Sequence, residues 1–357
     1  MTRYRHQMRN QAKQFRLMYH CLATMVTRCS NRGGSVLLSS TIRVANDVDQ
    51  YAMSFRPSDT EHTIVGRGSF AATVTQIDLH RLRLKRGKIS HASIAHGQLP
   101  TRRQGIFIGG CAKPAVAWKG VELMANCVGL IGYDQPFWYS MPGPSQWGSM
   151  TLPAEDLASL SVAMVGRDLT LPRHGLTTTA TPARHAKLLR LHAAAGHLAE
   201  HAPNIIHDPE AARGLEQALI EAMFGCMAGE ASHVASDTWG KQTIVLKRFR
   251  AALEANIDQP LYMPELCQTI GVPERTLRNH CYNHLGMSPK RYLLLRRLNL
   301  AHRALRAADP STTTVTEIAT SFGFWELGRF AVEYRAWCGE SPSASLNRAP
   351  GSERMRS

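Results

Sequence analysis

The strongest constraint on the fold is a pattern of apolar residues that occurs twice in the last third of the chain. Its first copy comprises Met263, Leu266, Cys267 and Ile270, followed by Gly271. Its second copy, 52 residues later, comprises Val315, Ile318, Ala319 and Phe322, followed by Gly323. Spacings of three and four place each set on one face of a helix, and the glycine favours the end of that helix. The chain therefore contains a duplicated helical unit.

A second helix is predicted after each glycine. Its apolar residues are Leu277 and Cys281 in the first copy and Phe330 and Tyr334 in the second, and each copy closes on a Gly-x-Ser-Pro sequence at 286–289 and 339–342. Thr314 and Glu317 form a capping-box pattern at the start of the second unit. Helix, tight turn and helix is the helix-turn-helix, whose second helix enters the DNA major groove. Residues 289–307 predict one long helix that joins the two units.

The second unit also carries a specific signature: an Ile-Ala pair, a Gly-Phe pair, two aromatic residues, a basic residue and the Gly-x-Ser-Pro stop. These residues are Ile318, Ala319, Gly323, Phe324, Phe330, Tyr334, Arg335, Gly339, Ser341 and Pro342. Residues 243–346 thus resemble the duplicated helix-turn-helix domain of the AraC/XylS family of bacterial transcription regulators. The resemblance implies sequence-specific binding of double-stranded DNA, no enzymatic activity, and RNA polymerase as a further partner.

Candidate base-reading residues lie on the polar face of the first predicted recognition helix and at the contact positions that the resemblance implies in the second unit. They are Arg275, Arg278, Asn279 and Tyr282 in the first unit, and Trp325 and Arg329 in the second. Arginine can bond to guanine O6 and N7, and asparagine to adenine N6 and N7. The alternative is a solvated polar face. Because the first helix offers three hydrogen-bonding readers and the second only Arg329, we expect the first unit to be the more selective.

Phosphate contacts are expected from basic residues near helix ends or on the linking helix. The candidates are Lys290, Arg291, Arg296 and Arg335. The whole chain has 42 Lys and Arg against 27 Asp and Glu, a net charge of +15. This balance favours a polyanionic partner, either nucleic acid or an anionic membrane surface. No stretch of eighteen apolar residues is present, so no membrane span is expected.

The rest of the chain predicts an α+β protein, with a β-rich N-terminal domain of barrel or cupin-like type ahead of the all-α C-terminal domain. Residues 1–40 form a basic extension and 230–242 a linker, while 347–357 form a tail. Residues 41–229 combine short strands with helices near 153–166, 182–202 and 209–229. The resemblance implies that this domain senses a small effector or forms a homodimer. The apolar stripe Leu215, Leu219, Met223 is either core or the dimer contact.

An enzyme remains the alternative function. His197, Glu200 and His201 match the His-x-x-Glu-His pattern, in which two histidines four residues apart could share a zinc ion in a metallohydrolase. The pattern is only five residues long and fixes three of them, so a chain with 16 histidines can match it by chance. We therefore expect no catalytic residues, no metal and no cofactor. The eight cysteines are scattered without a Cys-x-x-Cys pair, which favours reduced thiols and a cytoplasmic protein.

Overall fold

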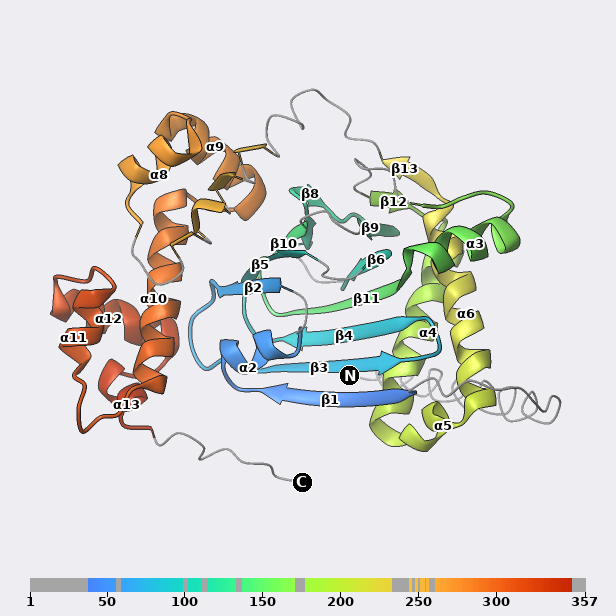
Figure 1. Cartoon of the computed structure of the whole chain (residues 1–357), viewed down its shortest axis with the longest axis horizontal. Helices are drawn as coiled ribbons and strands as arrows, with labels where there is room; N and C mark the ends of the chain where they lie inside the picture. The colour runs from blue at the N-terminus through green and yellow to red at the C-terminus, as the bar shows by residue number, and fades with distance from the viewer. Residues whose placement is uncertain are drawn as a thin grey trace, which may run out of the picture.

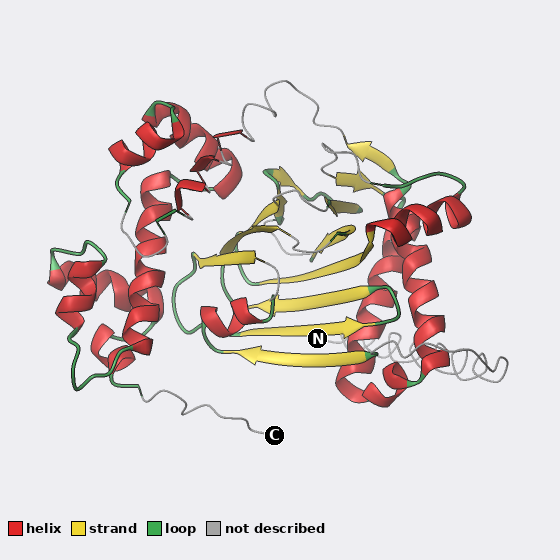
Figure 2. Cartoon of the chain, viewed as in Figure 1, coloured by secondary structure: helices red, strands yellow, loops and turns green. Residues whose placement is uncertain are grey.

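The chain folds into a β-rich N-terminal domain and a helical C-terminal domain (Figures 1 and 2). The structure is a computed structural model. It describes residues 38–55, 59–98, 102–110, 115–132, 137–170, 177–232, 244–245, 248–249, 251–253, 255–256 and 261–348. The β-rich and then all-α organisation expected from the sequence is confirmed. The predicted extension lies outside the described residues as far as residue 37, and so does most of the predicted linker.

Two antiparallel sheets form the N-terminal domain, and they do not close into a barrel. The larger sheet contains, in spatial order, β1 (Ser39–Ala45), β3 (Ala72–Asp78), β4 (Arg83–Ile89), β11 (Ser145–Pro153), β6 (Arg103–Gly109), β9 (Cys127–Ile131), β12 (Thr177–Thr179) and β13 (Glu230–Ser232). The smaller sheet contains β2 (Asp59–Ile64), β5 (Ser93–Gln98), β10 (Phe137–Met141), β7 (Ala117–Trp118) and β8 (Val121–Glu122). Strand β13 occupies the first residues of the predicted linker.

The central strands of the larger sheet are buried on both faces because their side chains alternate between two apolar cores, whereas the edge strand β1 is largely exposed. In β6, Phe107 belongs to the core that also contains residues of the smaller sheet, and it stacks on Trp118 of β7 with ring centroids 4.6 Å apart. Its neighbours Ile106 and Ile108 belong to the core on the opposite face, beneath the helices. An aromatic layer therefore fills the space between the sheets, and a mainly aliphatic layer joins the larger sheet to its helices.

Helices of the N-terminal domain are α2 (Val48–Met53), α3 (Ala154–Val165), α4 (Pro182–His201), α5 (Pro203–His207) and α6 (Pro209–Met227). Helices α4 and α6 pack against each other and against the larger sheet (Figure 1). The stripe Leu215, Leu219, Met223 on α6 is buried in this core. The interpretation of that stripe as a dimer contact is therefore wrong, because its apolar surface is already covered within one chain.

The C-terminal domain contains α8 (Met263–Ile270), α9 (Glu274–Leu285), α10 (Pro289–Ala307), α11 (Val315–Ser321), α12 (Leu327–Cys338) and α13 (Pro342–Leu346). The long helix α10 has the bounds predicted from the sequence, and the two helix-turn-helix units flank it (Figure 2). Ser288 caps its start by accepting a hydrogen bond from the amide of Arg291. Since α10 contributes buried residues to both units, it fixes their relative position.

The two domains share a packed interface along strand β2 of the smaller sheet. The indole N–H of Trp337 in α12 donates to the Ile64 carbonyl at 3.1 Å, and the Gly68 amide donates to the Trp337 carbonyl at 3.0 Å. The Thr63 hydroxyl lies 3.4 Å from the Tyr292 hydroxyl of α10. These contacts bring segments more than 200 residues apart together, so both helix-turn-helix units rest on the N-terminal domain.

Candidate nucleic-acid interface

The first helix-turn-helix unit presents one side of α9 to solvent. Helix α8 ends at Gly271, whose φ of 74° is a left-handed conformation suited to glycine. The turn allows Leu277 and Cys281 of α9 to pack fully buried against α8. The opposite side of α9 carries the four residues predicted to contact bases, all of them exposed: Arg275, Arg278, Asn279 and Tyr282.

Arg278 already has a partner within its own helix. Its guanidinium lies 2.6 Å from the carboxylate of Glu274, one turn earlier. Both side chains are more than half exposed, and such surface pairs contribute only about 0–1 kcal/mol. Arg278 can therefore leave Glu274 and bond to a base edge at a small cost in free energy.

The second unit positions fewer hydrogen-bonding groups. Thr314 and Glu317 form the predicted capping box, in which the carboxylate accepts the Thr314 amide at 2.7 Å. Arg329 lies exposed on the first turn of α12 and pairs with Glu333 at 3.1 Å. Trp325 is 76% exposed and precedes α12 in the connecting turn. The unit therefore offers one cation and one aromatic ring beside the helix start.

A basic cleft lies between the start of α10 and α12. Its volume is about 510 Å³, and its lining residues include Lys290, Arg291, Arg297, Trp325 and Arg329. Arg297, which the sequence analysis missed, donates to the Gly323 carbonyl at 3.2 Å and lies over the Phe324 ring, 5.0 Å from its centroid. Partial burial lowers the pKa of Arg297. Four basic side chains and two acidic ones, Glu326 and Glu333, line this cleft, so it has a net positive charge next to the second recognition helix.

Arg296 does not belong to this surface, which contradicts its predicted contact with phosphate. Its side chain is buried, and its guanidinium donates to the carbonyls of Leu253 and Asn256 at 2.9 and 3.2 Å. It also lies 3.7 Å from the carboxylate of Glu61 in β2. Adjacent arginines on α10 thus have different roles: Arg296 bonds to carbonyl groups in the interior, while Arg297 lines the cleft. The other predicted phosphate contacts, Lys290, Arg291 and Arg335, are exposed.

The residues of the alternative zinc motif are not grouped as potential metal ligands in the described part of the chain. The rings of His197 and His201 stack with centroids 4.1 Å apart, and Nδ1 of His201 lies 3.1 Å from the His197 carbonyl oxygen. His197, Glu200 and His201 are absent from the one group of three potential metal ligands found among the described residues. That group combines His302, Cys338 and Glu340.

In the described part of the chain, no helix is long and apolar enough to cross a membrane.

Comparison with known proteins finds similarity over part of the chain. Residues 266–348 match a family described as "Helix-turn-helix domain". The chain is 42% identical over 98 residues to a probable thc operon regulatory protein of Rhodococcus erythropolis, covering 28% of this chain and 30% of the relative. It is 29% identical over 148 residues to a XylDLEGF operon transcriptional activator of Pseudomonas putida, covering 42% and 44%. The match thus spans less than half of each relative.

Among solved structures, the chain is similar to one titled "Crystal structure of the AraC-like transcriptional activator CuxR". The TM-score is 0.38 at 14% identity, over 74% of this chain and 96% of that chain.

Proposed function

We propose that this chain, whose C-terminal domain is a duplicated helix-turn-helix of the AraC/XylS type, is a sequence-specific DNA-binding transcription regulator. The observation that carries the proposal is the pair of helix-turn-helix units attached to one helix, α10, in which α9 presents an exposed polar face and α12 an exposed face that combines Arg329 with apolar residues such as Val332. The family match over residues 266–348 covers both helices. The relatives are named as regulators or activators of operons, and their names give no support to a metallohydrolase.

The two helices would read successive turns of the major groove. Helix α10, which joins the two units, has 19 residues and a length of about 28 Å, somewhat less than the roughly 34–36 Å of one DNA turn. In this arrangement Arg275, Arg278 and Asn279 contact base edges from α9, with Tyr282 beside them. Arg329 and Trp325 contact the second half-site. The first half-site is then the more selective, because more hydrogen-bonding groups read it.

Phosphate contacts would come from the basic cleft and its surroundings. Lys290 and Arg291 lie exposed at the start of α10, Arg335 lies exposed on α12, and Arg297 lines the cleft between these helices. Contacts of this kind position a protein on DNA without reading its sequence. We assign Arg297 to this set in place of the buried Arg296.

Selection of binding sites from random DNA tests the base-reading role. We expect Arg278→Ala in the full-length chain to relax one base position, because losing a bidentate contact reduces discrimination by about 1–3 kcal/mol. Lys290→Ala should weaken binding to all sequences about equally. The matched control is Arg213→Ala on α6, since Arg213 is half exposed and pairs with Glu210 at 3.1 Å. An unchanged motif with Arg278→Ala would disprove α9 as the principal reader.

The N-terminal domain is proposed to control DNA binding through an effector or a homodimer. Its direct packing against both helix-turn-helix units supports control of this kind. Since the α6 stripe is buried, a dimer would use another surface. RNA polymerase is a proposed partner because the P. putida relative is named as an activator. A cytoplasmic location belongs to the same proposal, since the DNA target lies there.

A further inference from the structure

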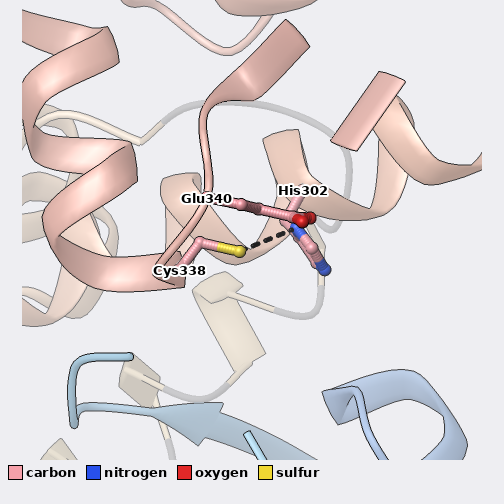
Figure 3. A group of neighbouring side chains, drawn as sticks. All are labelled: His302, Cys338 and Glu340. Atoms are coloured by element: carbon pink, nitrogen blue, oxygen red, sulfur yellow. Dashed lines mark hydrogen bonds between the residues drawn. The ribbon is translucent and has the colours of Figure 1, made fainter. Parts of the chain in front are cut away.

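Three potential metal ligands meet where the second helix-turn-helix unit adjoins the N-terminal domain. His302 lies on α10, Cys338 is the last residue of α12, and Glu340 precedes α13. One donor atom from each lies within 4.8 Å of the others, and all three side chains are partly buried. Figure 3 shows the three side chains directed toward one another from separate segments. Convergence from three segments requires the folded domain.

We propose that His302, Cys338 and Glu340 bind a thiophilic divalent cation of the zinc class. Imidazole nitrogen, thiolate sulfur and carboxylate oxygen are the donors that zinc takes in proteins. Nδ1 of His302 lies 3.5 Å from Sγ of Cys338. Ligands at about 2.0 Å and 2.3 Å from a tetrahedral ion stand about 3.5 Å apart, so this pair already has the separation that zinc requires.

An open cavity gives an ion access to the three donors. The cavity has a volume of about 490 Å³, and all three donors line it. Its other lining residues include Asn46, Asp47 and residues 68–71 of the N-terminal domain. Three protein ligands leave a fourth coordination position for water from this cavity. The site would therefore lie at the boundary between the two domains.

Binding requires one existing hydrogen bond to break, because Nδ1 of His302 now bonds to the Tyr334 hydroxyl and must release it to become a ligand. The Tyr334 hydroxyl donates a hydrogen bond to the Ser345 hydroxyl at 2.7 Å. It therefore accepts a hydrogen bond from the Nδ1–H group of His302 at 2.6 Å. Metal binding moves that imidazole proton to Nε2 and releases the thiol proton of Cys338 to solvent. Glu340 pairs with Arg348 and accepts from Ser345, and its carboxylate retains free lone pairs. The thiolate and carboxylate together match the charge of a divalent ion, while Arg306, Arg348 and Asp47 also line the cavity.

Binding at this position would affect how the domains dock. Trp337 and Gly339, which alternate with the ligands Cys338 and Glu340 along the chain, face the N-terminal domain. The Trp337 indole donates to the Ile64 carbonyl, and the Trp337 carbonyl accepts a hydrogen bond from the Gly68 amide. A Cβ at Gly339 would lie 3.2 Å from the backbone of Gly68. An ion that fixes Cys338 and Glu340 therefore also fixes the segment that contacts the sheet. This role is independent of base reading by α9.

Cobalt(II) titration of the reduced, full-length chain tests the site, because a thiolate ligand gives cobalt a strong charge-transfer absorption. We expect one equivalent of Co²⁺ to produce this band and Zn²⁺ to displace it. Cys338→Ser should abolish the band, and Glu340→Gln should weaken Co²⁺ binding by about tenfold or more. The matched control is Cys267→Ser, which removes another partly buried cysteine and should leave the band intact.

Three results would overturn the proposal: no binding of Co²⁺ or Zn²⁺, a band unchanged by Cys338→Ser, or a band lost with Cys267→Ser. Circular dichroism establishes that each variant is folded. Should Cys338→Ser unfold, Glu340→Gln decides the question, because an unchanged Kd for Co²⁺ excludes the carboxylate as a ligand. DNA binding by the metal-free chain distinguishes failure of this site from failure of the proposed function.

Discussion

At the scale of single residues, the most unusual side chain in the N-terminal core is His62 of β2. It is fully buried among aromatic rings, with centroids 4.5 Å from Phe55 and 4.7 Å from Tyr51. No described residue gives either ring nitrogen a hydrogen-bond partner. Burial, reinforced by the positive charges of His96, Arg303 and Lys85, lowers the pKa of His62 to about 3. The histidine is therefore neutral in the folded protein at neutral pH.

This placement predicts a loss of stability in mild acid. Because the pKa of the unfolded histidine is 6.5, the unfolded chain takes up a proton that the folded chain excludes as the pH falls from 6.5 toward 3. The stability present above pH 6.5 is then lost at about 1.4 kcal/mol per pH unit. Urea unfolding at pH 7 and pH 5 measures the loss, and His62→Phe should reduce it. His192 and His302, whose pKa values burial lowers to about 4, contribute to the remaining slope. An identical slope in the variant would refute the assignment.

Residue roles on α10 show what sequence patterns leave undetermined. The exposed positions of α9 were predictable because Leu277 and Cys281 define a single buried face. Helix α10 has neighbours on several sides, so adjacent Arg296 and Arg297 both face protein, one the interior and the other the cleft. The location of Arg296 depends on Glu61, which lies in a different domain. Helical spacing within 289–307 contains no information about that contact.

At the scale of elements, helix α12 has two roles, since Arg329 lies on its exposed first turn and Trp337 near its end is buried against β2. We expect Trp337→Phe to keep most of the packing but to leave the Ile64 carbonyl unpaired, at a cost of about 1–3 kcal/mol. Amide hydrogen exchange at Gly68, which donates to the Trp337 carbonyl, should accelerate about tenfold. Trp325→Phe is the control because Trp325 is exposed. Unchanged protection of Gly68 would show that the indole bond does not hold the domains together.

The helices of the C-terminal domain were predictable because their ends are marked locally by glycine, Ser-Pro and the Thr314 capping box. The strands were less predictable: the sequence indicated short strands within 41–229, but pairings such as β11 between β4 and β6 join distant segments. Burial of the α6 stripe also depended on this packing, since the same apolar face could serve a core or a dimer. Local patterns determine where elements begin and end, whereas distant contacts decide what covers them.

At the scale of the whole molecule, the interface between the domains should stabilise the DNA-binding domain. A fragment spanning 243–348 contains the apolar residues of both helix-turn-helix units, so we expect it to fold and to bind DNA. It should unfold at a lower urea concentration than the same domain in the full chain, because Trp337 becomes exposed and Arg296 loses Glu61. Its DNA affinity should fall steeply with salt, since phosphate contacts release counterions. An unfolded fragment, or binding independent of salt, would contradict this expectation.

The contact between Trp337 and residues 64–68 restricts how the protein can be re-engineered. A chimera that joined residues 243–348 to an unrelated sensor domain would retain its DNA specificity but present Trp337 and Gly339 to a foreign surface. Transplanting the recognition function together with its regulation therefore requires moving residues 59–71 as well. The unit that can be exchanged between proteins is then discontinuous in sequence, comprising the C-terminal domain and one strand with its following loop.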